Sequence, residues 1–220
     1  MIDTIFVPRG PEERAVRRAV DRAAAPHRVA VTGIGPLAAT LAVHDALAGP
    51  TMGRALVVGL CGLLSPAFSV GETLVYGEIV SANDAPVTID RTFAADVAQK
   101  IGRVQSGIRA LAVSDIVTSG SEKLELGLRF DAQAVDMESL PLVRLLSRAG
   151  VTVGVARVVS DAAGDDLPDL HMALDGSGGL DGFALALAMM RRPIAGARLA
   201  RNGTRALAAL EAMIGQLVAA

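Results

Sequence analysis

Residues 55–64, ALVVGLCGLL, are the stretch that decides the class of fold. No charged residue interrupts this run, and its Val and Leu content predicts a buried strand at residues 55–59. The run is shorter than the ~20 residues that span a bilayer, so we expect a soluble globular chain. A turn, residues 59–62, follows the strand. A tight packing turn is one interpretation, and a ligand crevice beyond the strand end is the other.

On both sides of this strand, short β-branched runs alternate with Ala-, Leu- and Arg-rich segments of helical period. The alternation predicts an α/β fold with a mainly parallel sheet covered by helices. The expected strands are residues 4–7, 28–32, 55–59, 72–79, 110–117, 134–136 and 152–159. The expected helices are residues 11–24, 36–47 and 139–148, followed by a helical C-terminal tail.

Composition limits the classes of function. The 220 residues, 51% hydrophobic and 20% charged, suffice for one domain over residues 1–220 and exclude a disordered chain. The net charge of −2 gives no electrostatic case for a nucleic-acid partner and favours a small-molecule substrate. The single Cys61 excludes an intramolecular disulfide, and the three histidines lack metal-ligand spacing, so we expect no metal and no cofactor. The N-terminus does not resemble a signal peptide, which predicts a cytoplasmic location.

Carboxylates follow two of the expected strands. Asp136 stands at the end of one expected strand with Glu138 two residues further on, and Asp161 follows another. A carboxylate at such a place is costly unless it caps a helix, pairs with a cation or acts on a ligand. A helix cap is favoured for Asp136, whereas for Glu138 stabilisation by the helix dipole and a ligand role are equally good. For Asp161 the following residues do not look like a helix start, which favours a site.

Three blocks in order carry a resemblance to a known family. They are TGIG at residues 32–35, VVGLCGLLSP with VGE at residues 57–66 and 70–72, and AVDMES with RVVSD at residues 134–139 and 157–161. Together they resemble the purine nucleoside phosphorylase and methylthioadenosine nucleosidase superfamily. The resemblance implies a three-layer α/β domain with a mixed, mostly parallel sheet and a helical C-terminal tail. It also implies a homodimer or larger homo-oligomer that cleaves the N-glycosidic bond of a purine nucleoside.

Further motifs of the sequence are similar to those of the hopanoid-associated phosphorylases. They are the Gly-Leu-x-Gly turn, the Asp-Met-Glu-Ser form, Leu-Pro at residues 167–168, and a tail with Asp-Gly at 175–176 and 181–182 and Arg-Arg-Pro at 191–193. This resemblance implies release of adenine from a 5′-substituted adenosine, adenosylhopane, with transient membrane contact as a further partner to be tested. The alternatives are a general purine nucleoside phosphorylase, a methylthioadenosine/S-adenosylhomocysteine-type nucleosidase, and a non-catalytic nucleoside-binding module. The retained Asp161 argues against the last, because binding alone needs no proton donor there.

The resemblance also implies roles for individual residues. Glu138, with the backbone of Met137, resembles a clamp for the two ribose hydroxyls. Asp161, oriented by Ser160, resembles the general acid that protonates purine N7.

A second acid and the glycine turn complete the expected site. Glu13 resembles the acid that activates the attacking water, with Glu12 as the alternative one residue away. For both, a role in the first turn of the helix is an equally good interpretation. We also expect Cys61, Gly62 and Arg157 to contribute to the substrate site.

The acceptor of the ribosyl group, water or phosphate, is a separate question. Phosphorylases of this superfamily place an arginine before the glycine turn and a serine inside it, where this chain has Val57 and Leu60. Neither side chain can bind an anion, which favours water. Arg157 could bind phosphate, or it could neutralise Glu138 or Asp161.

Overall fold

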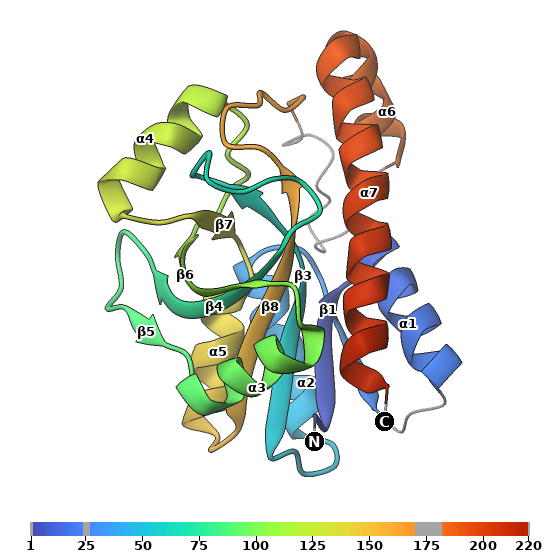
Figure 1. Ribbon diagram of the computed structural model, residues 1–220, viewed down its shortest axis with the longest axis vertical. Helices are drawn as coiled ribbons and strands as arrows, with labels where there is room; N and C mark the ends of the chain where they lie inside the picture. Colours follow the sequence, from blue (N-terminus) through green and yellow to red (C-terminus); the bar gives the residue numbers. More distant parts are fainter. Residues whose placement is uncertain (1, 24–26, 170–181, 220) are drawn as a thin grey trace.

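The structure, a computed structural model, describes residues 2–23, 27–169 and 182–219. Its centre is an eight-stranded mixed sheet in the order β2-β1-β3-β7-β6-β4-β5, with β8 paired to both β3 and β4 (Figure 1). The strands are β1 (Thr4–Pro8), β2 (Arg28–Thr32), β3 (Arg54–Leu63), β4 (Thr73–Val80), β5 (Val87–Thr88), β6 (Gln105–Ala112), β7 (Ala134–Asp136) and β8 (Thr152–Asp161). The buried strand predicted at residues 55–59 is present, and it continues to Leu63 as part of β3, which pairs with β1, β7 and β8.

Five of the strands form a closed ring, in which each strand pairs with two others. β3 pairs with β8, β8 with β4, β4 with β6, β6 with β7, and β7 with β3. The pairs β3–β7, β4–β5 and β4–β8 are antiparallel, whereas the others are parallel. At one point of the ring, Gly62 of β3 is in register with both Val135 of β7 and Asp161 of β8. The ring thus brings the acids after β7 and at the end of β8 to the glycine-containing end of β3.

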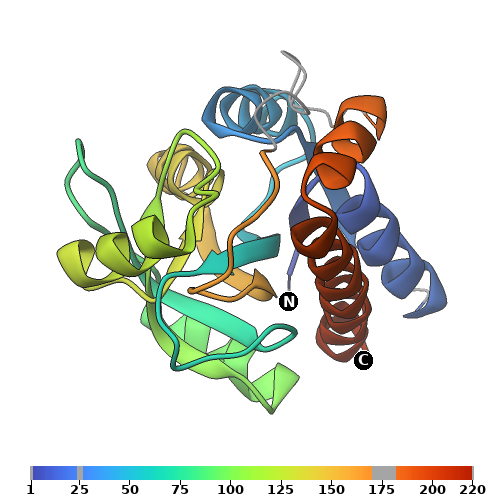
Figure 2. The ribbon, with the colours of Figure 1, turned by 90° about the horizontal axis from the view of Figure 1, so that it is seen from above.

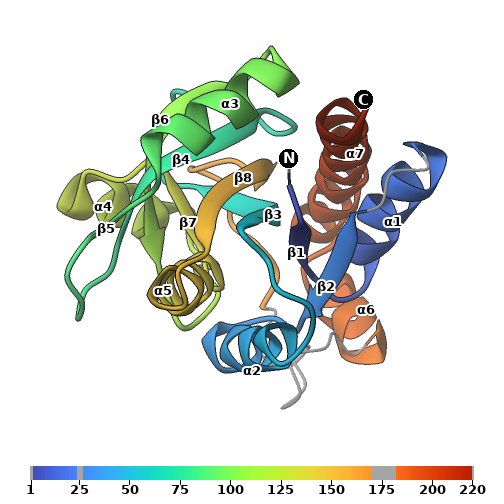
Figure 3. The same cartoon turned by 90° about the horizontal axis from the view of Figure 1, so that it is seen from below.

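Helices flank the sheet, and the predicted α/β fold with a helical C-terminus is confirmed. The helices are α1 (Pro11–Ala23), α2 (Pro36–Leu47), α3 (Arg91–Ile101), α4 (Gly120–Phe130), α5 (Ser139–Arg148), α6 (Gly182–Arg191) and α7 (Pro193–Val218). Helices α2 and α5 lie on one side of the sheet, away from α3 and α7 (Figure 3). Buried side chains of α2 and α5 pack into one apolar core, and those of α1, α3 and α7 pack into another. Among the described residues, no helix has both the length and the apolar character needed to cross a membrane.

The observed β6 differs from the strand predicted at residues 110–117. β6 begins at Gln105 and ends at Ala112, because its pairing with β4 starts at Gln105 opposite Leu74. The apolar residues that follow, Val113, Ile116 and Val117, line a pocket instead. Their apolar character therefore reflects a cavity wall and not a ladder of strand hydrogen bonds.

Helices α3 and α4 lie in a part of the chain for which no helix was predicted. Each begins at a side-chain cap: Asp90 accepts from the backbone N–H of Phe93 at 2.7 Å, and Ser119 accepts from that of Glu122 at 3.4 Å. Such caps are the usual start signals of helices. Helix α4 lies on the opposite side of the strand ends from α6 and α7 (Figure 2).

Candidate active site

A pocket of about 280 Å³ lies where β3, β7 and β8 end, between α4 and α7. Its wall is mostly aliphatic. The charged residues on the wall are Glu12, Asp115, Lys123, Asp136, Glu138 and Asp161. Of the site residues expected from the sequence, the pocket brings together Cys61, Gly62, Met137, Glu138, Ser160 and Asp161.

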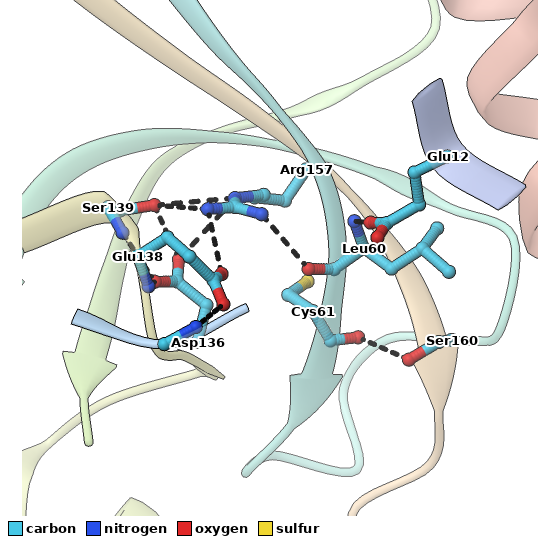
Figure 4. Close-up of polar contacts among 9 residues, drawn as sticks. Glu12, Leu60, Cys61, Asp136, Glu138, Ser139, Arg157 and Ser160 are labelled. Atoms are coloured by element: carbon cyan, nitrogen blue, oxygen red, sulfur yellow. Dashed lines mark hydrogen bonds and ion pairs between the residues drawn. The ribbon is translucent and has the colours of Figure 1, made fainter. Parts of the chain in front are cut away.

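Arg157 is completely buried beside this pocket (Figure 4). Its Nε lies 3.6 Å from Asp136 Oδ2, and its Nη2 lies 3.5 Å from Glu138 Oε2. The guanidinium also donates to Ser139 Oγ at 3.0 Å and to the Leu60 carbonyl at 3.4 Å. A buried charge is tolerated only with such partners. Of the two roles open to Arg157, the contacts match neutralisation of acids, and one of these acids is Glu138.

The Asp136 side chain binds the backbone at the start of α5. Its Oδ1 accepts from the backbone N–H groups of Glu138 and Ser139, at 3.2 and 2.9 Å, and its Oδ2 accepts from the Ser139 hydroxyl at 2.6 Å. Asp136 is not the N-cap residue predicted from the sequence, because the N-cap position of α5 is Glu138, but it does bind the first N–H of the helix. These contacts also fix the backbone on both sides of the Glu138 side chain.

Glu138 is held by the segment at residues 33–35, which connects β2 to α2. The backbone N–H of Gly35 donates to Glu138 Oε1 at 2.9 Å, and Gly35 has φ 92°, a conformation that favours glycine. Burial raises the pKa of Glu138, while Arg157 and the N–H donors oppose this rise. One oxygen of the carboxylate therefore faces a backbone donor and the other faces Arg157, and the group remains on the pocket wall.

The structure separates the two adjacent glutamates of α1. Glu12 lines the pocket, and its Oε1 accepts from the backbone N–H of Leu60 at 2.6 Å. Glu13 forms an ion pair with Arg17 on the same helix at 2.9 Å and is not part of the pocket wall. The water-activating role expected for Glu13 does not fit this position, because its carboxylate is engaged away from the cavity.

Burial raises the pKa of Glu12 to about 7. Arg157 and the Leu60 N–H act in the opposite direction, and the negative charge of Glu138 adds to the rise. A carboxyl group that titrates near neutral pH can both accept and release a proton under ordinary conditions.

Gly59 lets Glu12 and Arg157 approach the same point of β3. A Cβ atom on Gly59 would lie 2.7 Å from Arg157 Nη1 and 2.8 Å from Glu12 Oε1. Gly59 also has φ 143°, which is in the range that disfavours other residues. The turn predicted at residues 59–62 is wrong, because β3 continues through these residues to Leu63. Gly59 is a strand residue, and it makes room for two charged groups of the site.

Asp161 is hydrogen bonded through both oxygens. Its Oδ1 accepts from the Ser160 hydroxyl at 2.7 Å, and its Oδ2 accepts from Lys123 Nζ at 2.5 Å. The Ser160 hydroxyl also lies 3.1 Å from the Cys61 carbonyl oxygen. A Cβ atom on Gly62 would lie 3.0 Å from Asp161 Oδ2, so the absence of a side chain at Gly62 leaves space for the Asp161 carboxylate.

Lys123 was not identified from the sequence. Helix α4 places this lysine in the interior and leaves Leu128 87% exposed, the reverse of what hydrophobic periodicity predicts. One signal was present: Lys123 is one of only two lysines in the chain, and it follows the helix start at Ser119 by one turn.

The Cys61 thiol is not a nucleophile in this arrangement. Burial raises its pKa far above the ordinary value, so the thiol stays protonated at neutral pH. Cys61 contributes its carbonyl oxygen, which faces Ser160, and part of the pocket wall.

Comparisons with known proteins find similarity in the fold. No family model and no curated protein matches the sequence. Among solved structures, a 5′-methylthioadenosine/S-adenosylhomocysteine nucleosidase of Neisseria meningitidis in complex with methylthio-immucillin-A is similar over 100% of this chain and 99% of its own, with a TM-score of 0.71 and 13% identity.

Two structures from Helicobacter pylori are also similar. The MTAN covers 72% of this chain and 88% of its own, with a TM-score of 0.63 and 17% identity. The native futalosine hydrolase covers 97% of this chain and 98% of its own, with a TM-score of 0.65 and 18% identity. The chain therefore has the α/β fold of these nucleosidases. Part of the tail that resembles the hopanoid-associated phosphorylases, residues 175–176 and 181, lies outside the described residues.

Proposed function

We propose that the protein hydrolyses the N-glycosidic bond of a 5′-substituted adenosine and releases adenine. The observation that carries this proposal is the meeting of Glu12, Glu138 and Asp161 on the wall of one pocket, in a fold shared with nucleosidases. Each carboxylate has different partners, and each can serve a different part of the reaction.

Glu138 is the proposed ribose clamp. Its carboxylate is anchored by the Gly35 N–H and by Arg157, which leaves lone pairs directed at the pocket. A carboxylate can accept hydrogen bonds from two neighbouring hydroxyls, which suits the 2′ and 3′ positions of ribose. Met137, next to it on the wall, would contact the sugar.

Asp161 is the proposed general acid. Adenine leaves readily only when N7 receives a proton, and a positioned acid contributes typically ~10²–10⁴-fold to such a step. Ser160 orients the carboxylate through its hydroxyl. Gly62 keeps this part of the wall open for the base.

Glu12, and not Glu13, is the proposed general base. With its pKa raised to about 7, the Glu12 carboxylate can take a proton from water at neutral pH. It lies on the same pocket wall as Glu138, which would hold the ribose against the attacking water. The electron pair of the broken bond goes to the purine, and the hydroxide oxygen of the water bonds to C1′.

Room for a 5′ substituent supports the finer part of the proposal. A second hollow of about 340 Å³ shares Val113 and Met137 with the pocket. Its lining is largely apolar and includes Leu111, Leu126, Phe130 and Leu140. We propose that this hollow receives an apolar 5′ group, such as the hopane of adenosylhopane. A smaller methylthio group is the alternative.

An exposed apolar and basic site supports transient contact with a membrane. Met190 and Ile194 are 69% and 84% exposed at the junction of α6 and α7, next to Arg191 and Arg192. Apolar side chains beside arginines suit an interface with anionic lipids. This contact would bring a lipid-linked nucleoside to the protein.

The test is adenine release, followed by chromatography. The purified protein is incubated with adenosine, 5′-methylthioadenosine and an adenosine that bears a long apolar 5′ group. We expect adenine from all three, with the highest kcat/KM for the apolar substituent. Highest activity on 5′-methylthioadenosine would replace the substrate assignment by the methylthioadenosine-type alternative. No adenine from any of them would overturn the proposed function.

A further inference from the structure

We propose that Lys123 is a positioning residue that stores the proton which Asp161 passes to the leaving base. The inference rests on the proposed function, since it concerns the source of the proton for adenine. Lys123 is only 1% exposed, and its Nζ is 2.5 Å from Asp161 Oδ2.

The ammonium group is fixed by the backbone around it. Besides Asp161, Nζ lies 3.1 Å from the Asp165 carbonyl oxygen and 3.5 Å from that of Ala162. The start of α4 is tied to the same segment, since the backbone N–H of Gly120 donates to Asp166 Oδ1 at 2.9 Å. Lys123 therefore cannot swing away from Asp161 without breaking these contacts.

Both oxygens of Asp161 have a side-chain partner: the Ser160 hydroxyl lies 2.7 Å from Oδ1, and Lys123 Nζ lies 2.5 Å from Oδ2. To protonate the leaving base, Asp161 must carry a proton when the N-glycosidic bond breaks. The nearest proton that could be transferred is the one that Lys123 directs at Oδ2.

The start of α4 holds Lys123 opposite Asp161, because Lys123 lies one turn after the N-cap Ser119. Ser160 can accommodate the transfer, because its hydroxyl can donate to the Cys61 carbonyl oxygen, 3.1 Å away, once Asp161 is protonated.

The proposed step balances as follows. The Lys123 ammonium gives a proton to Asp161, and Asp161 gives one to purine N7, which leaves Lys123 as a neutral amine. The N-glycosidic bond breaks, and its electron pair stays on the purine. Water bonds to C1′ and loses a proton to Glu12. Solvent then returns a proton to Lys123 and removes one from Glu12.

The experiment compares Lys123→Arg and Lys123→Met with the exposed control Lys100→Met. Arginine keeps the positive charge but does not give up a proton in proteins. We expect both Lys123 variants to lower kcat for adenine release by at least ~10²-fold with KM within a few-fold of wild type. Lys100→Met should match wild type. A Lys123→Arg enzyme as active as wild type would overturn the proposal, since charge alone would then suffice.

A double variant separates a shared role from two independent ones. If Lys123 acts through Asp161, Lys123→Met combined with Asp161→Asn should be no slower than Asp161→Asn alone. If the fold losses in kcat of the two single variants multiply in the double variant, the proposal is overturned. If Lys123→Met does not fold, the arginine variant carries the test by itself. Absence of adenine release by the wild type would be a failure of the proposed function, whereas an active wild type with unaffected Lys123 variants would contradict only the role of Lys123.

Discussion

The carboxylate of Glu12 accepts a hydrogen bond from the backbone N–H of Leu60 at 2.6 Å. This contact joins the first turn of α1 to the glycine-containing end of β3, two segments that are far apart in the sequence. Because the Leu60 N–H binds the Glu12 carboxylate, the carboxylate stays on the pocket wall. The first prediction follows from this contact.

Glu12→Gln should lower kcat for adenine release by at least ~10²-fold, because glutamine keeps the acceptor for Leu60 but cannot take a proton from water. The matched control is Glu13→Gln, which removes only the ion pair with Arg17. The pH profile is the second measurement. Since the base must be ionised, kcat/KM of the wild type should fall as pH decreases below about 7. Equal losses in the two variants would contradict the assignment.

Asp161→Asn tests the general acid. Asparagine retains the shape of the side chain but supplies no acidic proton, so kcat should fall by at least ~10²-fold with little change in KM. Thermal unfolding, measured in parallel, reports any structural effect. If Asp161 serves only to hold Lys123 in place, the variant will be less stable and its activity per folded molecule will remain.

Glu138→Gln tests the ribose clamp through the sugar of the substrate. The wild type should prefer adenosine to 2′-deoxyadenosine, because a missing hydroxyl leaves a charged acceptor unpaired at a cost of about 1–3 kcal/mol. The glutamine variant should show a smaller preference. The measurement is kcat/KM for both nucleosides with both proteins, and equal rates of the wild type on the two sugars would exclude the clamp.

Much of this arrangement could be predicted from local sequence patterns. The buried strand at residues 55–59 and the acids Glu138 and Asp161 near strand ends follow from hydrophobic runs and their boundaries. The continuation of β3 to Leu63 does not follow from them, because the glycines at positions 59 and 62 are also typical of a turn. The closed ring of β3, β8, β4, β6 and β7 could not be predicted, because it depends on pairings between distant segments. The helical periodicity of the sequence and the charge of the side chains also do not distinguish Glu12 from Glu13, since both are acids in the same helical turn. Only tertiary packing decides which of them faces the cavity.

Gly59→Ala tests the space shared by Glu12 and Arg157. The added methyl would lie 2.7 Å from Arg157 Nη1 and 2.8 Å from Glu12 Oε1, and alanine is strained at φ 143°. We expect a loss of stability of about 1–3 kcal/mol and a lower kcat, as the two charged groups are displaced. The control is Gly215→Ala on α7, where the new methyl meets open space. Thermal unfolding and adenine release are measured for both, and an unaffected Gly59→Ala enzyme would contradict the close approach.

The last prediction is that water, and not phosphate, accepts the ribosyl group. A phosphate dianion in a closed site needs several charge-assisted donors. Here the Leu60 N–H is already bound by Glu12, Val57 is buried in the core, and the Arg157 guanidinium faces two carboxylates. A dianion at this place would meet more negative than positive charge.

The measurement is the rate of adenine release in phosphate-free buffer and in added phosphate, with the sugar product identified by mass spectrometry. We expect equal rates and a free ribosyl product that carries ¹⁸O when the reaction runs in labelled water. Glu12→Gln should slow this release in both buffers. A strict need for phosphate with a ribose 1-phosphate product would overturn the prediction, because the cluster around Arg157 would then have to open to admit an anion.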